Sequence, residues 1–426
     1  MNERTPLPLV MYRAAARVLG PAARLAVHAR ARSGKEDRSR LGERFGRTAL
    51  ARPSGQLVWI HGASVGESLS VLPLIDALLA ESQRSVLVTS GTVTSAKLMR
   101  ERLPPRAFHQ FVPIDVPSAV KRFLDHWKPD AGLFVDSELW PNLIFSAHGH
   151  GVKLALVNGR MSARAYAGWR RAQKTARHLL SCFDLCLAQD DLSAERLRLL
   201  GASGVCVTGN LKADVPPAPA DAAKMTELRD AIGARPVLLA ASTHPGEDET
   251  VLPAHDTLRR HFPDLLTIIV PRHPVRGAEI AMLCGTREHA RRSANQLPGS
   301  ETAVYIADTI GELTAFYRIV PFAFIGGSLV PNGGQNPLEA AKLARAVMAG
   351  PYTDNFAGVY ETIFAAQGDG RVHGCADIVA LASRWLSEPD CARKAGTDAA
   401  EAAIALGGAL EKTRVAIEAM LDHAPA

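Results

Sequence analysis

Short apolar runs alternate with helical-period segments along most of this chain, from residue 57 onward. Apolar runs of this length, separated by polar or glycine-containing stretches, are typical of buried strands. Seven of these runs precede residue 210, at 57–61, 85–89, 108–112, 131–135, 153–157, 184–188 and 205–208. Five more follow, at 237–241, 266–270, 303–306, 322–325 and 346–349.

Helices are predicted between these strands. In residues 67–81, for example, apolar side chains recur at helical spacing, as Val71, Leu74, Ile75 and Leu78 do. The alanine-rich residues 376–422 are also predicted to be helical. Residues 215–219, with the sequence VPPAP, interrupt the alternation and are the best candidate for a linker.

Strands that alternate with helices form parallel sheets covered on both faces, so the chain is predicted to fold as two Rossmann-like, doubly wound α/β domains. We expect an N-terminal segment at 1–48, a first domain at 49–214, and a second domain at 215–426 that includes the C-terminal helices. Ligands of such sheets bind beyond the carboxyl ends of the strands. The motifs that follow predicted strands are therefore expected to face one interdomain cleft.

Residues 320–350 contain a buried-type run, two glycine pairs, and then Asn336, Pro337, Leu338 and Glu339 at the start of an apolar-periodic segment. Glycines let the backbone approach a ligand closely, and Pro337 suits a first helical turn. Glu339 can accept hydrogen bonds from hydroxyl groups. This corner suits a nucleotide, although the same residues also fit a glycine-rich connection in any α/β domain.

The corner closely resembles the nucleotide-binding segment of the 3-deoxy-D-manno-oct-2-ulosonic acid (Kdo) transferases, which attach Kdo from CMP-Kdo to a lipid A precursor. Five further motifs occur in the family's order: HGASVGE at 61–67, DSELWPN at 136–142, GNLK at 209–212, STHPGE at 242–247 and PRHP at 271–274. Three residues depart from the family's pattern, namely Asp136, Pro245 and Gln335. The resemblance implies a GT-B-type glycosyltransferase with an acceptor-binding first domain and a CMP-Kdo-binding second domain.

The resemblance makes Glu67 the general base that removes a proton from the acceptor hydroxyl, because a positioned carboxylate is suited to that role. From the pattern alone, Glu67 is equally a helix-start glutamate. Glu138 and Lys212 match residues that stabilise the transition state, where Lys212 would offset charge on the departing phosphate. Their ordinary interpretations are a helix-start acid and a solvated lysine.

The resemblance also assigns residues to the donor. Arg272 has the planar guanidinium that pairs well with a phosphate. Residues 309–312, TIGE, have the spacing of a helix capping box, so Glu312 has a structural interpretation as well. The CMP-binding candidates are Pro271, Arg272, Ile310, Gly311, Glu312, Asn336, Pro337, Leu338 and Glu339. Further acceptor or donor contacts are expected from Ser64, Gly66, Arg160, Arg164, Ser242, Thr243 and Gly246.

The positive charge of the chain is concentrated at its N-terminus. Residues 1–48 hold eleven Arg and Lys against four Asp and Glu, an excess of +7, whereas the whole chain has a formal charge of +6. A basic, apolar N-terminus fits an anionic membrane surface better than nucleic acid. Residues 7–27 are interrupted by arginines and two prolines, so an interfacial helix is expected. A short membrane anchor and a solvated or core-packed helix are the alternatives. No clean cleavage site follows, which argues against a secretory signal.

No metal or other cofactor is expected. The six cysteines form no C-x-x-C pair, which fits reduced thiols, and His61, His244 and His273 lack the spacing of a metal site. The chain also contains no D-x-D pair. A CMP-linked donor has a single phosphate, which backbone amides and an arginine can hold.

The leading hypothesis is an inverting, metal-independent transfer of Kdo from CMP-Kdo to lipid IVA, a step of lipopolysaccharide inner-core biosynthesis. We expect the partners to be CMP-Kdo, the lipid A precursor and an anionic membrane, at the cytoplasmic face of the bacterial inner membrane. A GT-B transferase of another nucleotide sugar and a non-catalytic sugar-binding protein are the alternatives. A dehydrogenase is not expected, because no G-x-G-x-x-G follows the first strand.

Overall fold

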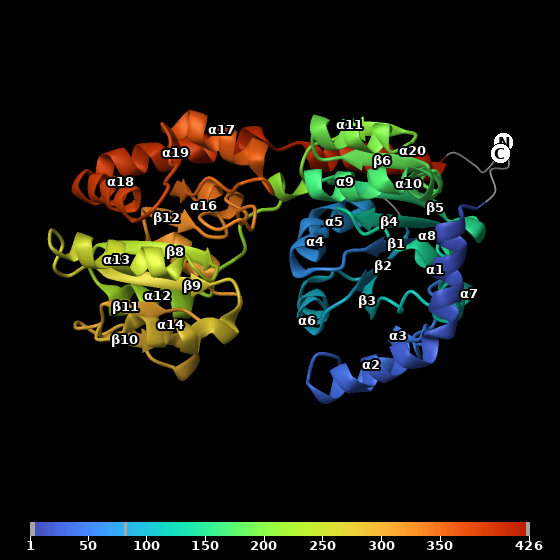
Figure 1. The fold of residues 1–426 in the computed structure, drawn as a ribbon, viewed down its shortest axis with the longest axis horizontal. Coiled ribbons are helices and arrows are strands. Elements are labelled where there is room, and N and C mark those ends of the chain that lie inside the picture. Colours follow the sequence, from blue (N-terminus) through green and yellow to red (C-terminus); the bar gives the residue numbers. More distant parts are fainter. Residues whose placement is uncertain (1–4, 81–82, 423–426) are drawn as a thin grey trace. The chain divides into compact units, whose positions relative to one another are not determined.

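The structure is a computed structural model that describes residues 5–80 and 83–422. The chain divides into two compact units (Figure 1). One unit runs to Val215 and takes in the C-terminal residues from Gly407, and the other spans Pro216–Leu406. Each unit is built on its own parallel sheet.

The first unit contains a seven-stranded sheet in the order β3-β2-β1-β4-β5-β6-β7, and every neighbouring pair is parallel. Its central strands are buried along their whole length, as strands covered on both faces must be. The strands are β1 (Leu57–His61), β2 (Ser85–Ser90), β3 (Ala107–Phe111), β4 (Ala131–Val135), β5 (Lys153–Gly159), β6 (Leu185–Ala188) and β7 (Val205–Val207).

Helices pack on both faces of this sheet and enclose two apolar clusters, one around Trp59 and Phe134 and one around Ile60 and Leu133. The α-helices are α1 (Leu7–Val18), α2 (Gly20–Arg32), α3 (Leu41–Arg44), α4 (Val65–Ser70), α5 (Leu72–Ala80), α6 (Val93–Arg102), α7 (Pro117–Trp127), α8 (Pro141–Gly149), α9 (Ala163–Arg171), α10 (Gln173–Leu180), α11 (Asp191–Leu199) and α20 (Ala409–Asp422). Two 3-10 turns, η1 (Arg38–Arg40) and η2 (Leu211–Ala213), complete the unit.

The second unit contains a six-stranded parallel sheet in the order β10-β11-β9-β8-β12-β13. Its strands are β8 (Val237–Thr243), β9 (Leu266–Pro271), β10 (His289–Arg291), β11 (Val304–Ile306), β12 (Phe322–Ile325) and β13 (Ala346–Ala349). Its helices are α12 (Ala222–Ile232), α13 (Asp248–Arg259), α14 (Gly277–Cys284), α15 (Leu313–Ile319), α16 (Leu338–Lys342), α17 (Ala357–Gln367), α18 (Cys375–Ser387) and α19 (Pro389–Ala405), with the turns η3 (Pro274–Arg276) and η4 (Arg292–Ala294).

Each sheet reverses its strand order at one point. In the first sheet the chain leaves β1 toward β2 and β3, and later strands are added on the other side, beginning with β4. In the second sheet the same reversal separates β8 from β12. Ligands of open α/β sheets bind at such switch points, beyond the carboxyl ends of the strands. The loops after β1, β4, β8 and β12 are therefore the places to look for a site.

Two element predictions need correction. The helix predicted over 67–81 is two helices, α4 and α5, which meet at Val71. Pro73 follows at the second position of α5, and a proline is tolerated only in the first turn of a helix. The predicted end of that helix, Glu81, lies outside the described residues. Strand β10 was not predicted, because its three residues, His-Ala-Arg, form no apolar run.

The expected division of the chain was wrong at both ends. Helix α20, red in Figure 1, belongs to the first unit and not to the second, because its Ile417 and Leu421 are buried in the first unit's core. Asp214 fixes its start by accepting hydrogen bonds from the N–H groups of Gly408 and Leu410, both at 2.7 Å. The N-terminal 48 residues are also part of the first unit and not a separate segment.

Among the described residues, the structure contains no helix with the length and apolar character needed to cross a bilayer.

Candidate active site

The predicted site residues form two clusters, one at the switch point of each sheet. In the first unit, Glu67 lies in the first turn of α4, directly after β1. Ser64 caps that helix, and its hydroxyl donates to Glu67 Oε1 at 2.6 Å. The N–H of Ala63 donates to Glu67 Oε2 at 2.7 Å. These two bonds fix the carboxylate and leave further lone pairs on each oxygen for a substrate. Ser64 and Gly66 are exposed beside it.

Glu138 lies across the switch point, in the loop between β4 and α8. Trp140, which is 41% exposed, donates its indole N–H to Glu138 Oε2 at 2.6 Å. Burial raises the pKa of Glu138; the Trp140 hydrogen bond opposes this, and the negative charges of Glu67 and Asp136 add to it. Because β4 pairs with β1, Glu67 and Glu138 follow neighbouring strand ends at the same edge of the sheet.

Lys212 is held at the same edge of the sheet. Its ammonium group pairs with Asp136 Oδ2 at 3.0 Å. Asp136 Oδ1 accepts a hydrogen bond from the amide of Asn158 at 2.5 Å, and the carbonyl of that amide accepts from the N–H of Leu211 at 2.9 Å. One polar network therefore connects the ends of β4 and β5 with the turn that carries Lys212.

Neither Asp136 nor Asn158 was predicted to belong to the site. Both have left-handed backbones, with φ of 59° and 54°, and Ser242 at the end of β8 has φ of 58°. Such conformations are uncommon outside glycine, and they concentrate at functional sites. Asn and Asp tolerate this region better than other residues, so a polar Asx residue at a strand end was the available signal.

The predicted acceptor arginines are placed differently from each other. Arg160 is half-buried, and its backbone N–H donates to Asp136 O at 3.3 Å, so it lies next to the network. Arg164 is exposed on α9 and lines a hollow of about 440 Å³ together with Ser162, Ala165, Gly168 and Trp169.

His61, at the end of β1, is buried against Thr89, and burial lowers its pKa to about 4. It is therefore a neutral packing residue.

In the second unit, the carboxylate of Glu247 organises the switch point. This side chain is fully buried and accepts hydrogen bonds from four backbone N–H groups. The donors are His244 at 2.8 Å, Gly327 at 2.6 Å, and Ser328 and Leu329 at 2.9 Å each. Glu247 thus joins the loop after β8, which contains Gly246 and follows Ser242 and Thr243 at the end of the strand, to the loop after β12. Glu247 belongs to the STHPGE motif, but no role was predicted for it.

Two further contacts draw the motifs of this unit together. The amide of Gln335 lies 3.1 Å from His244 Nε2, so the residue that departs from the family's pattern contacts the STHPGE loop. The backbone N–H of Arg272 donates to Thr243 O at 3.0 Å. The Arg272 side chain is exposed, and its guanidinium makes no hydrogen bond or ion pair within the described part of the chain. Pro271 before it is buried in β9.

The segment before α15 holds Ile310, Gly311 and Glu312. Ile310 is 70% exposed, and Gly311 has φ of 87°. The capping box suggested by the sequence does not form, because α15 begins at Leu313 and Glu312 makes no capping bond. Arg292 instead donates to both oxygens of Glu312, at 2.9 and 3.2 Å. Burial opposes ionisation of Glu312, but Arg292 and the Thr309 hydroxyl overcome that effect and lower its pKa.

Glu339 lies in the first turn of α16, where the sequence placed it. The Thr314 hydroxyl of α15 donates to its carboxylate, so the corner at 336–339 adjoins the segment after 310–312. Burial raises the pKa of Glu339, and the Thr314 hydrogen bond and Arg318 oppose that rise. The side-chain oxygen of Asn336 accepts a hydrogen bond from the N–H of Leu338 at 3.1 Å, and Pro337 directly precedes α16.

Among the described residues, no group of three or more His, Cys, Asp or Glu side chains is arranged to hold a metal ion.

Comparison with known proteins decides the family. Residues 39–215 match the family described as 3-deoxy-D-manno-octulosonic-acid transferase (kdotransferase). A 3-deoxy-D-manno-octulosonic acid transferase of Haemophilus influenzae is 34% identical over 88% of this chain and 90% of its own length. A probable mitochondrial transferase of the same name from Arabidopsis thaliana is 36% identical over 81% of this chain and 80% of its own length. The chain belongs to the Kdo transferase family. It is therefore a glycosyltransferase.

Solved structures agree on the fold of this Kdo transferase. A glycosyltransferase from Rickettsia africae superposes with a TM-score of 0.61 at 12% identity, covering 87% of this chain and all of that one. A putative UDP-N-acetylglucosamine 2-epimerase from Listeria monocytogenes gives a TM-score of 0.60 at 14% identity, covering 88% and 98%. The predicted fold class, two Rossmann-like domains of the GT-B type, is confirmed. Because the two relatives differ in activity, the fold alone does not select the reaction.

Proposed function

We propose that this Kdo transferase moves Kdo from CMP-Kdo to a lipid A precursor, lipid IVA, with inversion at the anomeric carbon. The observation that carries the proposal is the cluster at the first switch point. There, Ala63 and Ser64 fix Glu67, Glu138 follows the neighbouring strand, and Asp136 holds Lys212. Direct displacement needs a base for the acceptor hydroxyl and positive charge near the leaving phosphate, and this cluster contains both kinds of group.

In the proposed reaction, Glu67 takes the proton of the acceptor hydroxyl as its oxygen bonds to the anomeric carbon. The bond from that carbon to the phosphate oxygen breaks, and CMP leaves with the bonding electrons. Attack from the face opposite the phosphate inverts the configuration. Lys212 offsets the negative charge of the leaving group, and Glu138 stabilises the transition state from the other side of the switch point.

We assign the nucleotide to the second unit. The free guanidinium of Arg272 suits the single phosphate of CMP, because its planar fork matches phosphate oxygens. Glu339 is half-buried and retains acceptor capacity for a hydroxyl of the nucleotide. Ile310, Gly311, Glu312 and residues 336–338 would line the base and sugar. The reaction is proposed to need no metal, since the donor carries one phosphate and the chain has no D-x-D pair.

The N-terminal helices support a location at the cytoplasmic face of the inner membrane. Leu7, Met11, Val18 and Leu25 are 63% exposed or more, and arginines lie between them. Exposed apolar and basic side chains on one short helical segment are the combination that binds an anionic interface. Some of the segment also packs on the protein, since Leu9 is buried and the Tyr12 hydroxyl donates to Asp115 at 2.8 Å.

The test uses purified protein, CMP-Kdo and a tetraacylated lipid A precursor in detergent, with mass analysis of the lipid. The expected product is heavier than the acceptor by the mass of the added Kdo. Glu67→Gln should abolish its formation, while CMP should still raise the melting temperature of that variant. Stabilisation by UDP or GDP and not by CMP would favour the alternative, a GT-B transferase of another nucleotide sugar. Full turnover by Glu67→Gln would refute the assigned base.

A further inference from the structure

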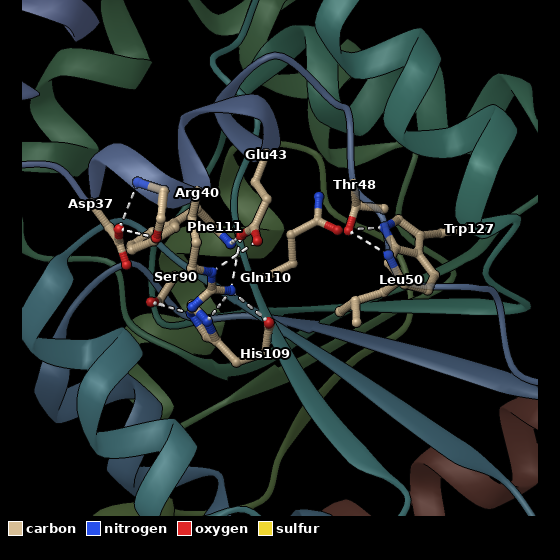
Figure 2. Close-up of polar contacts among 11 residues, drawn as sticks. Asp37, Arg40, Glu43, Thr48, Leu50, Ser90, His109, Gln110, Phe111 and Trp127 are labelled. Atoms are coloured by element: carbon tan, nitrogen blue, oxygen red, sulfur yellow. Dashed lines mark hydrogen bonds and ion pairs between the residues drawn. The ribbon is translucent and has the colours of Figure 1, made fainter.

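Residues 36–45, just after the basic N-terminal helices, form a charged clamp on the edge strand β3. Glu43 accepts a hydrogen bond from the N–H of Phe111 at 2.7 Å and pairs with Arg40 at 2.8 and 2.9 Å. Arg40 also donates to the carbonyl of His109 at 2.8 Å, as Figure 2 shows. Glu43, Glu36 and Arg44 are all at least nine-tenths buried. Buried charges of this kind persist only where partners satisfy them, so the clamp holds a defined geometry.

Arg44 extends the clamp toward the switch point. Its guanidinium donates to Glu36 Oε2 at 2.9 Å, to the carbonyl of Val112 at 3.2 Å and to the carbonyl of Gly91 at 2.5 Å. Gly91 directly follows β2, the strand that neighbours β1. Arg44 therefore fixes the first residue of the loop beyond β2.

Gly91 in turn contacts the loop that carries the proposed base. The N–H of Gly91 donates to the carbonyl of Ala63 at 3.2 Å, and the N–H of Ala63 donates to Glu67 Oε2 at 2.7 Å. The approach is close, since a Cβ on Gly91 would lie 3.3 Å from the Ala63 oxygen. A continuous path of hydrogen bonds thus runs from Glu36 through Arg44, Gly91 and Ala63 to the Glu67 carboxylate.

We propose that Arg44 is a positioning residue for Glu67, and that it couples the membrane-proximal N-terminal segment to the site of proton transfer. The inference rests on the proposed function of Glu67 as the base. The coupling is mechanical: Arg44 holds Gly91 at its carbonyl, Gly91 holds Ala63, and Ala63 sets the orientation of the carboxylate. Small displacements of a catalytic group have large effects on rate, because the reacting atoms must be aligned at the moment of transfer.

Arg40 provides a matched control on the same segment. The guanidinium groups of Arg40 and Arg44 both lie 4.8 Å from the centre of the Phe111 ring, and both pair with a buried glutamate. Arg40 contacts His109, however, and Arg44 contacts Gly91. A lysine at either position keeps the charge but loses the planar fork that reaches several acceptors. The two substitutions therefore differ in that Arg44 bonds Gly91 directly, whereas Arg40 reaches the neighbouring Ser90 only through His109.

The experiment compares Arg44→Lys with Arg40→Lys in the full chain, using CMP-Kdo and the lipid acceptor, and measures kcat, both KM values and amide hydrogen exchange. We expect Arg44→Lys to lower kcat about 10- to 100-fold, with both KM values little changed, because a misaligned base affects the transition state and not ground-state binding. Exchange at residues 62–70 should become faster in Arg44→Lys. Arg40→Lys should keep kcat within about threefold and leave that exchange unchanged.

Several results would overturn the inference. One is a normal kcat in Arg44→Lys. If that variant shows faster hydrogen exchange at 62–70 and no loss of kcat, the role of Arg44 is purely structural. Equal losses of kcat in both lysine variants would also count against it. If Arg44→Lys does not fold, Glu36→Gln weakens the same path while keeping the side chain's shape, and a smaller fall in kcat than that of Arg44→Lys is expected. Normal kcat in a folded Glu36→Gln would then refute the path.

The outcomes also separate this inference from the proposed function. If Glu67→Gln is inactive and Arg44→Lys is unimpaired, the base assignment stands and the positioning role fails. If Glu67→Gln turns over normally, the base assignment fails, and the positioning role fails with it.

Discussion

Replacing Glu247 by glutamine should destabilise the second unit strongly, although the two side chains have nearly the same shape. The Glu247 carboxylate is fully buried and accepts four backbone N–H donors from two loops. A glutamine oxygen accepts about two of them, and the NH₂ group then faces the other two donors. Each buried donor left without a partner costs about 1–3 kcal/mol, so the free energy of unfolding should fall by about 2–6 kcal/mol.

The assay is urea-induced unfolding of the full chain, followed by hydrogen exchange in the peptide that contains residues 323–329. Exchange reports on the second unit separately, which matters because a chain with two units need not unfold in one transition. Glu249→Gln is the matched control. Glu249 is exposed and accepts a bond from the N–H of Gly246 at 3.0 Å, so its substitution should change stability by about 0.5 kcal/mol or less.

Equal destabilisation by Glu247→Gln and Glu249→Gln would contradict this prediction. So would a wild-type rate of hydrogen exchange at 323–329 in Glu247→Gln. The first result would mean that the four donors find other acceptors, and the second that the loop does not depend on the carboxylate. A change in the urea m-value would indicate an altered unfolded or native state and would require the free energies to be compared at the midpoint.

Three further predictions concern titration, metal and membrane. The pKa of Glu138 is raised in the folded state, so its ionisation lowers the stability of the fold as the pH rises above the pKa of the unfolded state. Glu138→Gln should therefore raise Tm at pH 7, lose that advantage below about pH 4, and lower activity. A lower Tm at pH 7 would contradict this prediction. Transfer should continue in excess EDTA, and activity that is lost and then restored by magnesium would show that a metal is required. Deleting residues 1–30 should raise KM for the lipid acceptor far more than for CMP-Kdo. It should also weaken binding to anionic vesicles, and the binding of the full chain should fall as salt rises. Unchanged vesicle binding after the deletion would mean that the helices are structural.

The sequence predicted the strands well because a parallel sheet buries its strands on both faces. Runs such as LVWIH at β1 and AGLFV at β4 are continuous and short, and they leave little ambiguity. The motifs follow those strands, so their placement at the switch points was also predictable. Strand β10 was missed because an edge strand of three residues needs no apolar run. The return of α20 to the first unit was missed because an alanine-rich helical pattern does not specify which sheet it covers.

The contacts within the site were less predictable than its location. Asp136 is one strand and one helix away from Asn158, and it is 76 residues from Lys212, yet the three side chains form one network. Helical or strand periodicity describes neighbours within an element, whereas such pairs depend on which strand ends lie side by side. The capping box, one of the two interpretations of Glu312, illustrates the same limit, since Arg292, from the turn η4, binds the carboxylate instead.

The number of backbone donors on each carboxylate distinguishes Glu247 from Glu67, the proposed base. Glu247 follows a strand and stands in a motif, as Glu67 does, but its lone pairs are directed at four N–H groups inside the protein. A general base must offer a lone pair to the substrate, so Glu247 is unsuited to that role whatever its position. Glu67 accepts from one side-chain hydroxyl and one N–H, an arrangement that orients the carboxylate and leaves acceptor capacity. By the same criterion Glu339, which accepts from Thr314, is suited to meet a hydroxyl of a bound ligand.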